Sequence, residues 1–276
     1  MGRKDSIVSP FAAGSGRKRD LTFPDFSGQM SGAALAQCRD RTGENALATT
    51  LTLGAAGSLN LGVVNGVPCC RMINAGLINQ GPVLSVQSMT QVHPALTKGN
   101  LFLSGNTDDT MVYRVYMIAR VTATPGGVNP DVGLQLLNTI NSSDGLLRSN
   151  KPGMGIQIST TGNCDLVING QTSLQAISLQ TAAQGYVNTD FNAYEFRILN
   201  ATTTTDAVLK VLLNGNLKQA ISWGAGSNLP IPSQVGPPAG SVISGFLANV
   251  NQMAAGLELD VALLRVQSAP TEAALF

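Results

Sequence analysis

Glu258 and Asp260 are two carboxylates at alternate positions of a segment with the pattern of a β-strand. Residues i and i+2 of a strand share one face, so their carboxyl groups would lie side by side. Two carboxyl groups about 5–5.5 Å apart suit the hydrolysis of a glycosidic bond with retention of configuration. The simpler interpretation, which we favour, is that both residues face solvent from a half-buried strand.

His93 is the only histidine, so catalysis by a nucleophile with a histidine base would depend on it. Pro94 follows it in an apparent loop, and no Gly-x-Ser-x-Gly turn accompanies it. We therefore interpret His93 as a structural or surface residue. The glycine-rich segments also lack the Gly-x-Gly-x-x-Gly spacing of a nucleotide site.

Asp108 and Asp109 lie in a loop pattern, Gly-Asn-Thr-Asp-Asp-Thr, where hard oxygen ligands could bind Ca²⁺. EF-hand spacing is missing, and a solvated turn explains the pair as well. Trp223 is the only tryptophan, and it could stack on a sugar or pack in a hairpin or core. We keep Asp109 and Trp223 as candidate glycan contacts.

The four cysteines, Cys38, Cys69, Cys70 and Cys164, contain no Cys-x-x-Cys pair. Zinc-site spacing is therefore missing, and we expect reduced thiols that are buried as small hydrophobic groups. A disulfide between the adjacent Cys69 and Cys70 is the alternative. The sequence predicts no metal site and no cofactor.

Composition describes a folded chain with an unusually uncharged surface. Of 276 residues, 43% are hydrophobic, which excludes disorder throughout. Only 12% are charged, about half the usual share. Thr, Ser, Asn, Gln and Gly must cover much of the surface, as in a protein that packs against partners or in an ordinary polar β-protein.

Short apolar-alternating runs separated by turn residues dominate the chain from about residue 49 onward. Many short strands at this spacing predict a β-sandwich or barrel rather than alternating strands and helices. The strands are expected at residues 50–53, 58–64, 71–73, 83–87, 111–121, 132–137, 154–158, 164–168, 174–179, 193–199, 207–213, 217–223, 241–247 and 257–266. Helix is expected only at residues 31–39 and 271–276.

Two segments carry the clearest strand signals. Residues 194–219 read as three strands, and Asn214-Gly215 marks a hairpin between the last two. In residues 111–121 the odd positions form one apolar face, while Arg114 and Arg120 mark the opposite face.

Several motifs occur in the order known from one family. They are an Asp-x-Thr-Gly turn in residues 38–45, the long strand 112–121, the pair 153–158 and 164–170, the strand 194–198, the hairpin 209–217 and a final strand with a Pro-Thr-Glu tail at 259–272. In this order residues 35–272 resemble the concanavalin A-like (laminin-G-like) jelly rolls. The resemblance implies an all-β jelly-roll β-sandwich.

This family includes glucan hydrolases, which place a Glu-x-Asp-x-(x)-Glu series on one strand. Here Ala262 and Leu263 stand where the resemblance would require the third carboxylate. We therefore expect no enzymatic activity. The strand at Tyr194 lacks the family's tryptophan, and a proline-rich loop spans residues 230–238, so the family's ligand site is not carried over residue by residue.

The first 20 residues carry a net charge of +3, from five basic residues against Asp5 and Asp20, and the rest carries −2. We divide the chain into an extended basic N-terminal arm, residues 1–30, and a jelly-roll sandwich, residues 31–276. The arm lacks interleaved aromatic residues, so it is not expected to read nucleic acid. The basic residues proposed to dock this arm on a partner are Arg3, Lys4, Arg17, Lys18 and Arg19.

These features favour a virion structural protein, most plausibly a bacteriophage capsid decoration (cement) protein anchored through its arm and its subunit contacts. The expected partners are a major capsid protein or other virion subunits, with a homo-oligomer, for which a trimer is a guess. No apolar run of about 20 residues or signal peptide is evident, so we expect no membrane, synthesis in the host cytoplasm and a place on the virion. The alternative is a carbohydrate-binding, lectin-like module, which a glycan array would distinguish.

Overall fold

A computed structural model describes the strands of the chain and the segments that join some of them. The described residues are 19–22, 49–52, 57–74, 83–86, 112–122, 132–137, 153–158, 162–169, 174–199, 208–222, 228–229, 247–252, 258–269 and 271–276. The structural statements below concern these residues.

The strands form two antiparallel sheets. The eight-stranded sheet contains β1 (Arg19–Thr22), β3 (Gly57–Val64), β4 (Val67–Asn74), β6 (Val112–Val121), β11 (Asn192–Leu199), β12 (Val208–Leu213), β13 (Asn216–Ser222) and β15 (Glu258–Ala269). The seven-stranded sheet contains β2 (Thr49–Thr52), β5 (Val83–Val86), β7 (Val132–Leu137), β8 (Gly153–Ile158), β9 (Cys164–Asn169), β10 (Leu174–Gln180) and β14 (Leu247–Gln252).

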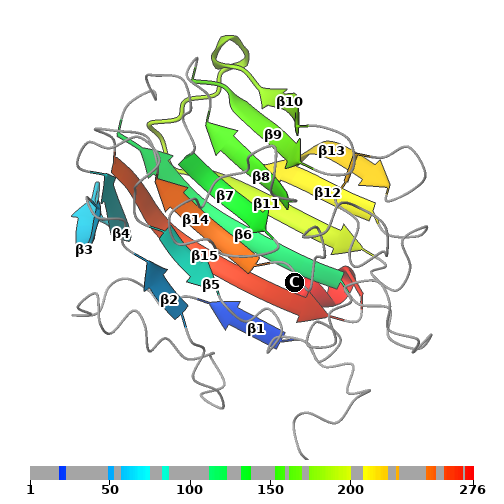
Figure 1. The fold of residues 1–276 in the computed structure, drawn as a ribbon, viewed down its shortest axis with the longest axis horizontal. Helices are drawn as coiled ribbons and strands as arrows, with labels where there is room; N and C mark the ends of the chain where they lie inside the picture. The colour runs from blue at the N-terminus through cyan, green and yellow to red at the C-terminus, as the bar shows by residue number, and fades with distance from the viewer. Residues whose placement is uncertain are drawn as a thin grey trace, which may run out of the picture.

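Strand order follows β13-β12-β11-β6-β15-β4-β3 in the first sheet, where β1 pairs with β15, and β10-β9-β8-β7-β14-β5-β2 in the second. Figure 1 shows the two sheets in layers with their strands roughly aligned. The architecture is an all-β jelly-roll sandwich, as the sequence predicts. Within each sheet, strands that are distant in the sequence pair with each other.

Alternation along each strand places the core between the sheets. On β6, Val115, Met117, Ala119 and Val121 are buried, which confirms the predicted apolar face. The register aligns them with buried residues of β11 and β15, such as Phe196 beside Val115. Arg114 and Arg120 lie on the opposite face, as predicted, but Arg114 is only 9% exposed, so that face is not simply solvated.

Asn-Gly pairs turn two hairpins. Asn214 and Gly215 have φ values of 52° and 77°, and Asn65 and Gly66 have 51° and 78°. Positive φ at both central residues is the type I′ turn that matches the twist of the flanking strands. The predicted Asn214-Gly215 hairpin is therefore confirmed, and it joins β12 to β13.

Most strand predictions agree with the structure to within a few residues, with three differences. The strand expected at residues 241–247 is found at Leu247–Gln252. β1 was not predicted, and it lies inside the proposed arm, where Arg19 pairs with Ser268 of β15. β4 runs from Val67 to Asn74 and is longer than the expected run at 71–73. The rest of the arm and the expected helix at 31–39 lie outside the described residues.

The chain ends in a single turn of 3-10 helix, η2 (Ala273–Leu275), where the sequence predicts helical turns. Leu275 is buried in a small apolar cluster with Val112 and Ala269, against which Leu199 and Ala274 pack. Val112 and Ala269 face each other in the register of β6 and β15. The C-terminal segment is therefore seated against the outer side of the eight-stranded sheet.

Candidate functional sites on the two outer faces

Each sheet has an outer face that points away from the core, and the two outer faces differ in chemistry. The face of the eight-stranded sheet, called the charged face, carries two ion-pair networks. Their members are Arg71, Arg114, Arg120, Glu195, Arg197, Lys210, Glu258, Asp260 and Glu272. The outer face of the seven-stranded sheet is called the neutral face.

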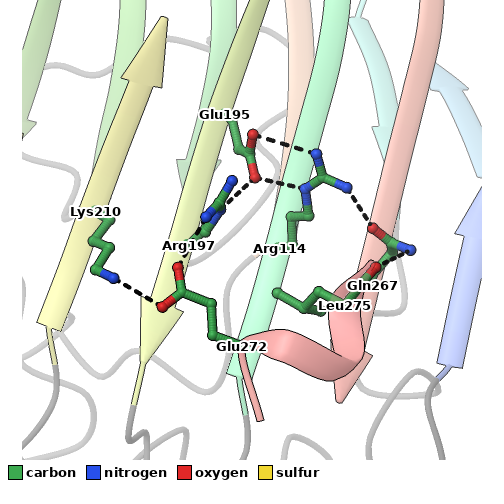
Figure 2. A network of polar contacts seen from close by, with 7 residues as sticks. All are labelled: Arg114, Glu195, Arg197, Lys210, Gln267, Glu272 and Leu275. Carbon is green, nitrogen blue, oxygen red and sulfur yellow. Dashed lines mark hydrogen bonds and ion pairs between the residues drawn. The ribbon is translucent and has the colours of Figure 1, made fainter. Parts of the chain in front are cut away.

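Three cations stand in one row of the charged face. Arg114 on β6 is opposite Arg197 on β11, and Arg197 is opposite Lys210 on β12. Like charges directly opposite each other destabilise a sheet. This row therefore needs nearby negative charge, and Figure 2 shows where that charge comes from.

Glu195 supplies the first compensating charge from within β11. Its Oε1 accepts hydrogen bonds from the Nε atoms of both Arg114 and Arg197, each at 2.6 Å, and its Oε2 accepts one from Nη2 of Arg114 at 3.3 Å. Glu195 is only 3% exposed. Because water is largely excluded from this pair, the two arginines are the main stabilisation of that carboxylate.

Glu272 supplies the second charge from the C-terminal segment. Its two carboxylate oxygens accept hydrogen bonds from Nη1 of Arg197 at 2.9 Å and from Nζ of Lys210 at 2.8 Å. Burial raises the pKa of Glu272, but the hydrogen bonds from Lys210 and Arg197 outweigh it, so the net pKa is lowered. Glu272 therefore holds the segment after β15 to β11 and β12.

The last residues complete this clamp. Gln267 accepts a hydrogen bond from Nη1 of Arg114 at 3.0 Å and donates one to the carbonyl oxygen of Leu275 at 3.5 Å. The ring of Phe276 lies 4.8 Å from the guanidinium carbons of both Arg114 and Arg197. This end of the charged face is thus occupied by the protein's own C-terminus.

The second network surrounds Asp260, which lies between Arg71 and Arg120 in the register. Its Oδ1 accepts from Nε of Arg71 at 2.8 Å, and its Oδ2 accepts from Nε of Arg120 at 3.0 Å. Arg71 also pairs with Glu258 at 3.2 Å. Asp260 is 0% exposed, so the expectation that it faces solvent is wrong, because two arginines cover it.

These contacts define what the charged face can do chemically. Both oxygens of Asp260 accept hydrogen bonds from arginines, which disfavours its use as a nucleophile or a proton acceptor. Burial, followed by the charge of Asp260, raises the pKa of the neighbouring Cys69 to about 11, so that thiol stays protonated at neutral pH. The geometry is that of a structural clamp.

Register across the seven-stranded sheet defines the neutral face. One row contains Thr52, Val83, Asn251, Gly133, Gln157, Asp165 and Ser178. The adjacent row on the same face contains Thr50, Ser85, Asn249, Gln135, Gly155, Val167 and Ala176. The row between them contains the buried pair Ile156 and Leu166, so by register these two rows belong to the side of the sheet away from the core.

The neutral face combines amides, hydroxyl residues and glycines with three apolar residues, Val83, Val167 and Ala176. Asp165 is the only ionisable residue in the two rows, and neither row contains an aromatic residue. Gln157 and Asp165 are half-buried, Ala176 and Ser178 are exposed, and Val167 keeps only 7% exposure. Among these described side chains the face is thus more open at β10 than at β9.

Asp165 is the most polar point of this face. Burial raises its pKa above the ordinary value, and a hydrogen bond from the Ser178 side chain opposes that rise without cancelling it. Glycines on β7 and β8, Gly133 and Gly155, occupy positions in the same two rows. A glycine within a strand often marks a place where a ligand or another backbone comes close.

Sequence reasoning missed this face. Its signal is an amide or hydroxyl residue at alternate positions of a strand, as in Leu-Ala-Asn-Val-Asn-Gln of β14. That pattern is indistinguishable from an ordinary solvated strand until the pairing of β7 with β14 is known.

The candidate residues selected from the sequence are only partly placed. Asp109, Trp223, His93, Asp108, Arg3, Lys4, Arg17, Lys18 and Cys38 lie outside the described residues. Cys69, Cys70 and Cys164 are buried and lie outside any disulfide, as expected. Burial raises the pKa of the Cys164 thiol to about 12.

Within the described ranges, no three His, Cys, Asp or Glu side chains are grouped closely enough to hold a metal ion. None of the helices in those ranges has the length and apolar character needed to span a bilayer.

Comparison with solved structures supports the fold. No protein-family profile matches the sequence, and no curated protein sequence matches it. A carbohydrate esterase from the Shiga toxin-encoding bacteriophage phi24B is similar in structure, with a TM-score of 0.50 and 8% identity over 90% of this chain and 96% of that chain. At this identity the similarity shows the fold alone, an all-β sandwich.

Two further structures are similar at lower scores. The metal-free carbohydrate recognition domain of Emp46p has a TM-score of 0.48 and 10% identity over 89% of this chain and 94% of that chain. The binding domain of botulinum neurotoxin DC has a TM-score of 0.48 and 11% identity over 89% of this chain and 47% of that chain.

Proposed function

We propose that this chain is a carbohydrate-binding module that recognises uncharged glycans on its neutral face and catalyses no reaction. The observation that carries the proposal is the composition of that face. Two adjacent rows across the seven-stranded sheet hold mainly amides, hydroxyl residues and glycines, with three apolar residues and with Asp165 as their only ionisable residue.

Sugar hydroxyl groups both donate and accept hydrogen bonds. Amide side chains also do both, whereas an ionised carboxylate only accepts them. The positions of Gln135, Gln157, Asn249 and Asn251 form a block at the junction of β7, β8 and β14. Such a block matches the hydroxyl pattern of a saccharide better than it matches an apolar or a charged ligand.

The charge of the face selects the glycan class. No lysine or arginine occupies the two rows, so a carboxylated or sulfated glycan would meet Asp165 without a compensating cation. Like-charge juxtaposition disfavours such ligands. We therefore infer uncharged oligosaccharides as the ligands.

The lack of aromatic residues in the two rows limits the affinity of a single site. Without a stacking platform, binding depends on hydrogen bonds that exchange with water, each contributing about 0.5–1.5 kcal/mol. Weak single sites become effective when several are presented together. The proposed module would therefore act in multivalent form or on repetitive polysaccharides.

Binding to an array that carries both neutral and acidic glycans tests the proposal. We expect saturable signals on neutral oligosaccharides and no enrichment on sialylated or sulfated ones, with no product released on prolonged incubation. An array without neutral hits, or with acidic glycans preferred, would contradict it. Hydrolysis or deacetylation of a bound glycan would contradict the non-enzymatic part.

A second candidate function, a subunit of a virus particle such as a capsid decoration protein, rests on the basic arm. β1 anchors residues 19–22 on β15, so Arg19 belongs to the sandwich, and Arg17 and Lys18 immediately precede it in the sequence. A positively charged tether at that point suits docking on an acidic neighbour. The virion would then be its location.

Deleting residues 1–18 distinguishes this second candidate, because the deletion spares β1. If the arm is the anchor, the shortened protein folds and keeps any glycan binding but no longer associates with particles. Normal association of the shortened protein with particles would rule out the tether.

A further inference from the structure

The edges of the two sheets are not equally protected against pairing with other strands. An edge strand exposes unpaired N–H and C=O groups, and proteins limit this by short edges, bulges or charged side chains. β2 and β1 have four residues each. β10 has an irregular register between Ser178 and Gln180. β13 has one at Lys218, which adds a charge to the edge.

β3 has none of these protections. It runs for eight residues, Gly57–Val64, with no charged residue and no proline. Its register with β4 is continuous from Gly57 opposite Asn74 to Val64 opposite Val67. Among the described strands none pairs with its other edge.

Turn geometry specifies which backbone groups point outward from β3. In a two-residue Asn65-Gly66 hairpin the flanking pair, Val64 and Val67, is hydrogen-bonded, and hydrogen-bonded pairs then alternate along the ladder. Gly62 and Asn60 therefore bond to β4. The N–H and C=O groups of Gly57, Leu59, Leu61 and Val63 point to the open edge.

Exposed apolar side chains lie at the same end of the strand. Val63 is 70% exposed and Val67 is 36% exposed. A neighbouring strand would form hydrogen bonds with the outward N–H and C=O groups of these four residues. It would also cover the Val63 side chain. The required occupant is an extended, uncharged strand with small or apolar residues.

We infer that β3 pairs with β3 of a second copy of this chain, antiparallel across a two-fold axis at Asn60. This register is the one that uses all four outward positions, since Gly57 meets Val63 and Leu59 meets Leu61 of the other copy. The exposed Val63 side chain then lies beside a glycine, which leaves room for it. The strand is complementary to itself.

Electrostatics permits this pairing. Among the described residues of β3 and β4, the nearest charge to the axis is Arg71, which pairs with Asn60 in the ladder and is neutralised by Asp260. With strands about 4.8 Å apart, the two Arg71 positions would be about 14 Å apart across the axis, which exceeds the screening length of about 8 Å at physiological salt. The pairing would join two eight-stranded sheets into one and present two neutral faces in one particle.

Engineered cysteines test the register directly. At a non-hydrogen-bonded antiparallel pair the Cα atoms are about 4.5 Å apart, within the range that a disulfide spans. Asn60→Cys should therefore cross-link into a covalent dimer under mild oxidation, in a Cys38→Ser background. The control is Ala220→Cys, an exposed position on the same sheet face at the protected edge, β13. It should remain monomeric on a non-reducing gel.

The second measurement is the mass in solution, by sedimentation, of the protein without engineered cysteines. We expect twice the 28.6 kDa chain mass, a shift to the monomer mass for Val63→Lys and no shift for Leu217→Lys, whose parent side chain on β13 is 55% exposed. A monomer or a trimer for the unmodified chain overturns the inference. A Val63→Lys variant whose dimer is as stable as that of the unmodified chain also overturns it. Equal cross-linking of Asn60→Cys and Ala220→Cys has the same consequence. Glycan binding by a monomer would leave the proposed function intact.

Discussion

Replacing Glu195 by glutamine should lower the free energy of unfolding by about 3–5 kcal/mol, the usual cost of removing one partner from a buried ion pair. Glu195 is 3% exposed and holds both Arg114 and Arg197 through one oxygen. Glutamine has nearly the same shape, so it opens no cavity. It removes the charge that separates two arginines in neighbouring strands and turns an amide N–H toward one of them.

Glu272→Gln is the matched control, because it makes the same chemical change on the same row of cations. The Glu272 side chain is 31% exposed, and exposed ion pairs contribute about 0.2–1 kcal/mol. Urea denaturation of both variants at neutral pH measures the difference. A loss for Glu195→Gln that is no larger than that for Glu272→Gln would show that the charged face is not held by its buried carboxylate.

Replacing Asp165 by asparagine should weaken the proposed glycan binding by about 10- to 100-fold. A hydrogen bond to a charged group contributes about 1.5–3 kcal/mol, and about 1.4 kcal/mol corresponds to a factor of ten. Asp165 is the only ionisable residue of the two neutral rows, so no neighbouring carboxylate can replace it there. Isothermal titration with the neutral oligosaccharide that binds best on the array measures the change.

The same variant carries a pH signature. Burial raises the pKa of Asp165 in the folded protein, so its carboxylate becomes protonated at a higher pH than an ordinary aspartate. Glycan affinity should therefore fall as the pH is lowered, beginning above the usual aspartate range, whereas the affinity of Asp165→Asn should stay flat. The control is Glu258→Gln on the charged face, which makes the same kind of change without touching the neutral rows. Loss of binding in that control would contradict the assignment.

Alternation and turn residues were enough to predict much of the fold. The Asn214-Gly215 hairpin and the apolar face of β6 follow from local chemistry, because a type I′ turn needs two positive φ values and a strand repeats every two residues. β14 shows where this reasoning fails. Residues 241–247, Ser-Val-Ile-Ser-Gly-Phe-Leu, hold more β-branched and aromatic residues than Leu247–Gln252, whose alternate asparagines pair in register with Gln135 and Gly133 of β7.

Side-chain environments depended on contacts that no local pattern contains. Asp260 was placed on the correct face, but its burial follows from Arg71 and Arg120, which are 189 and 140 positions away in the sequence. Arg114 is covered because the C-terminal residues return to the outer side of the sheet. Neither pairing is visible before the strand order is known.

The most direct test of the glycan-binding account is a map of backbone amide chemical shifts, recorded while a neutral oligosaccharide is added to the isotope-labelled protein. The account predicts that saturable shifts cluster on Gln157, Asp165 and Ser178 and on the strands β7, β8 and β14 beside them. Shifts confined to the charged face around Arg114 and Asp260, or no shifts with any neutral glycan at millimolar concentration, would contradict it.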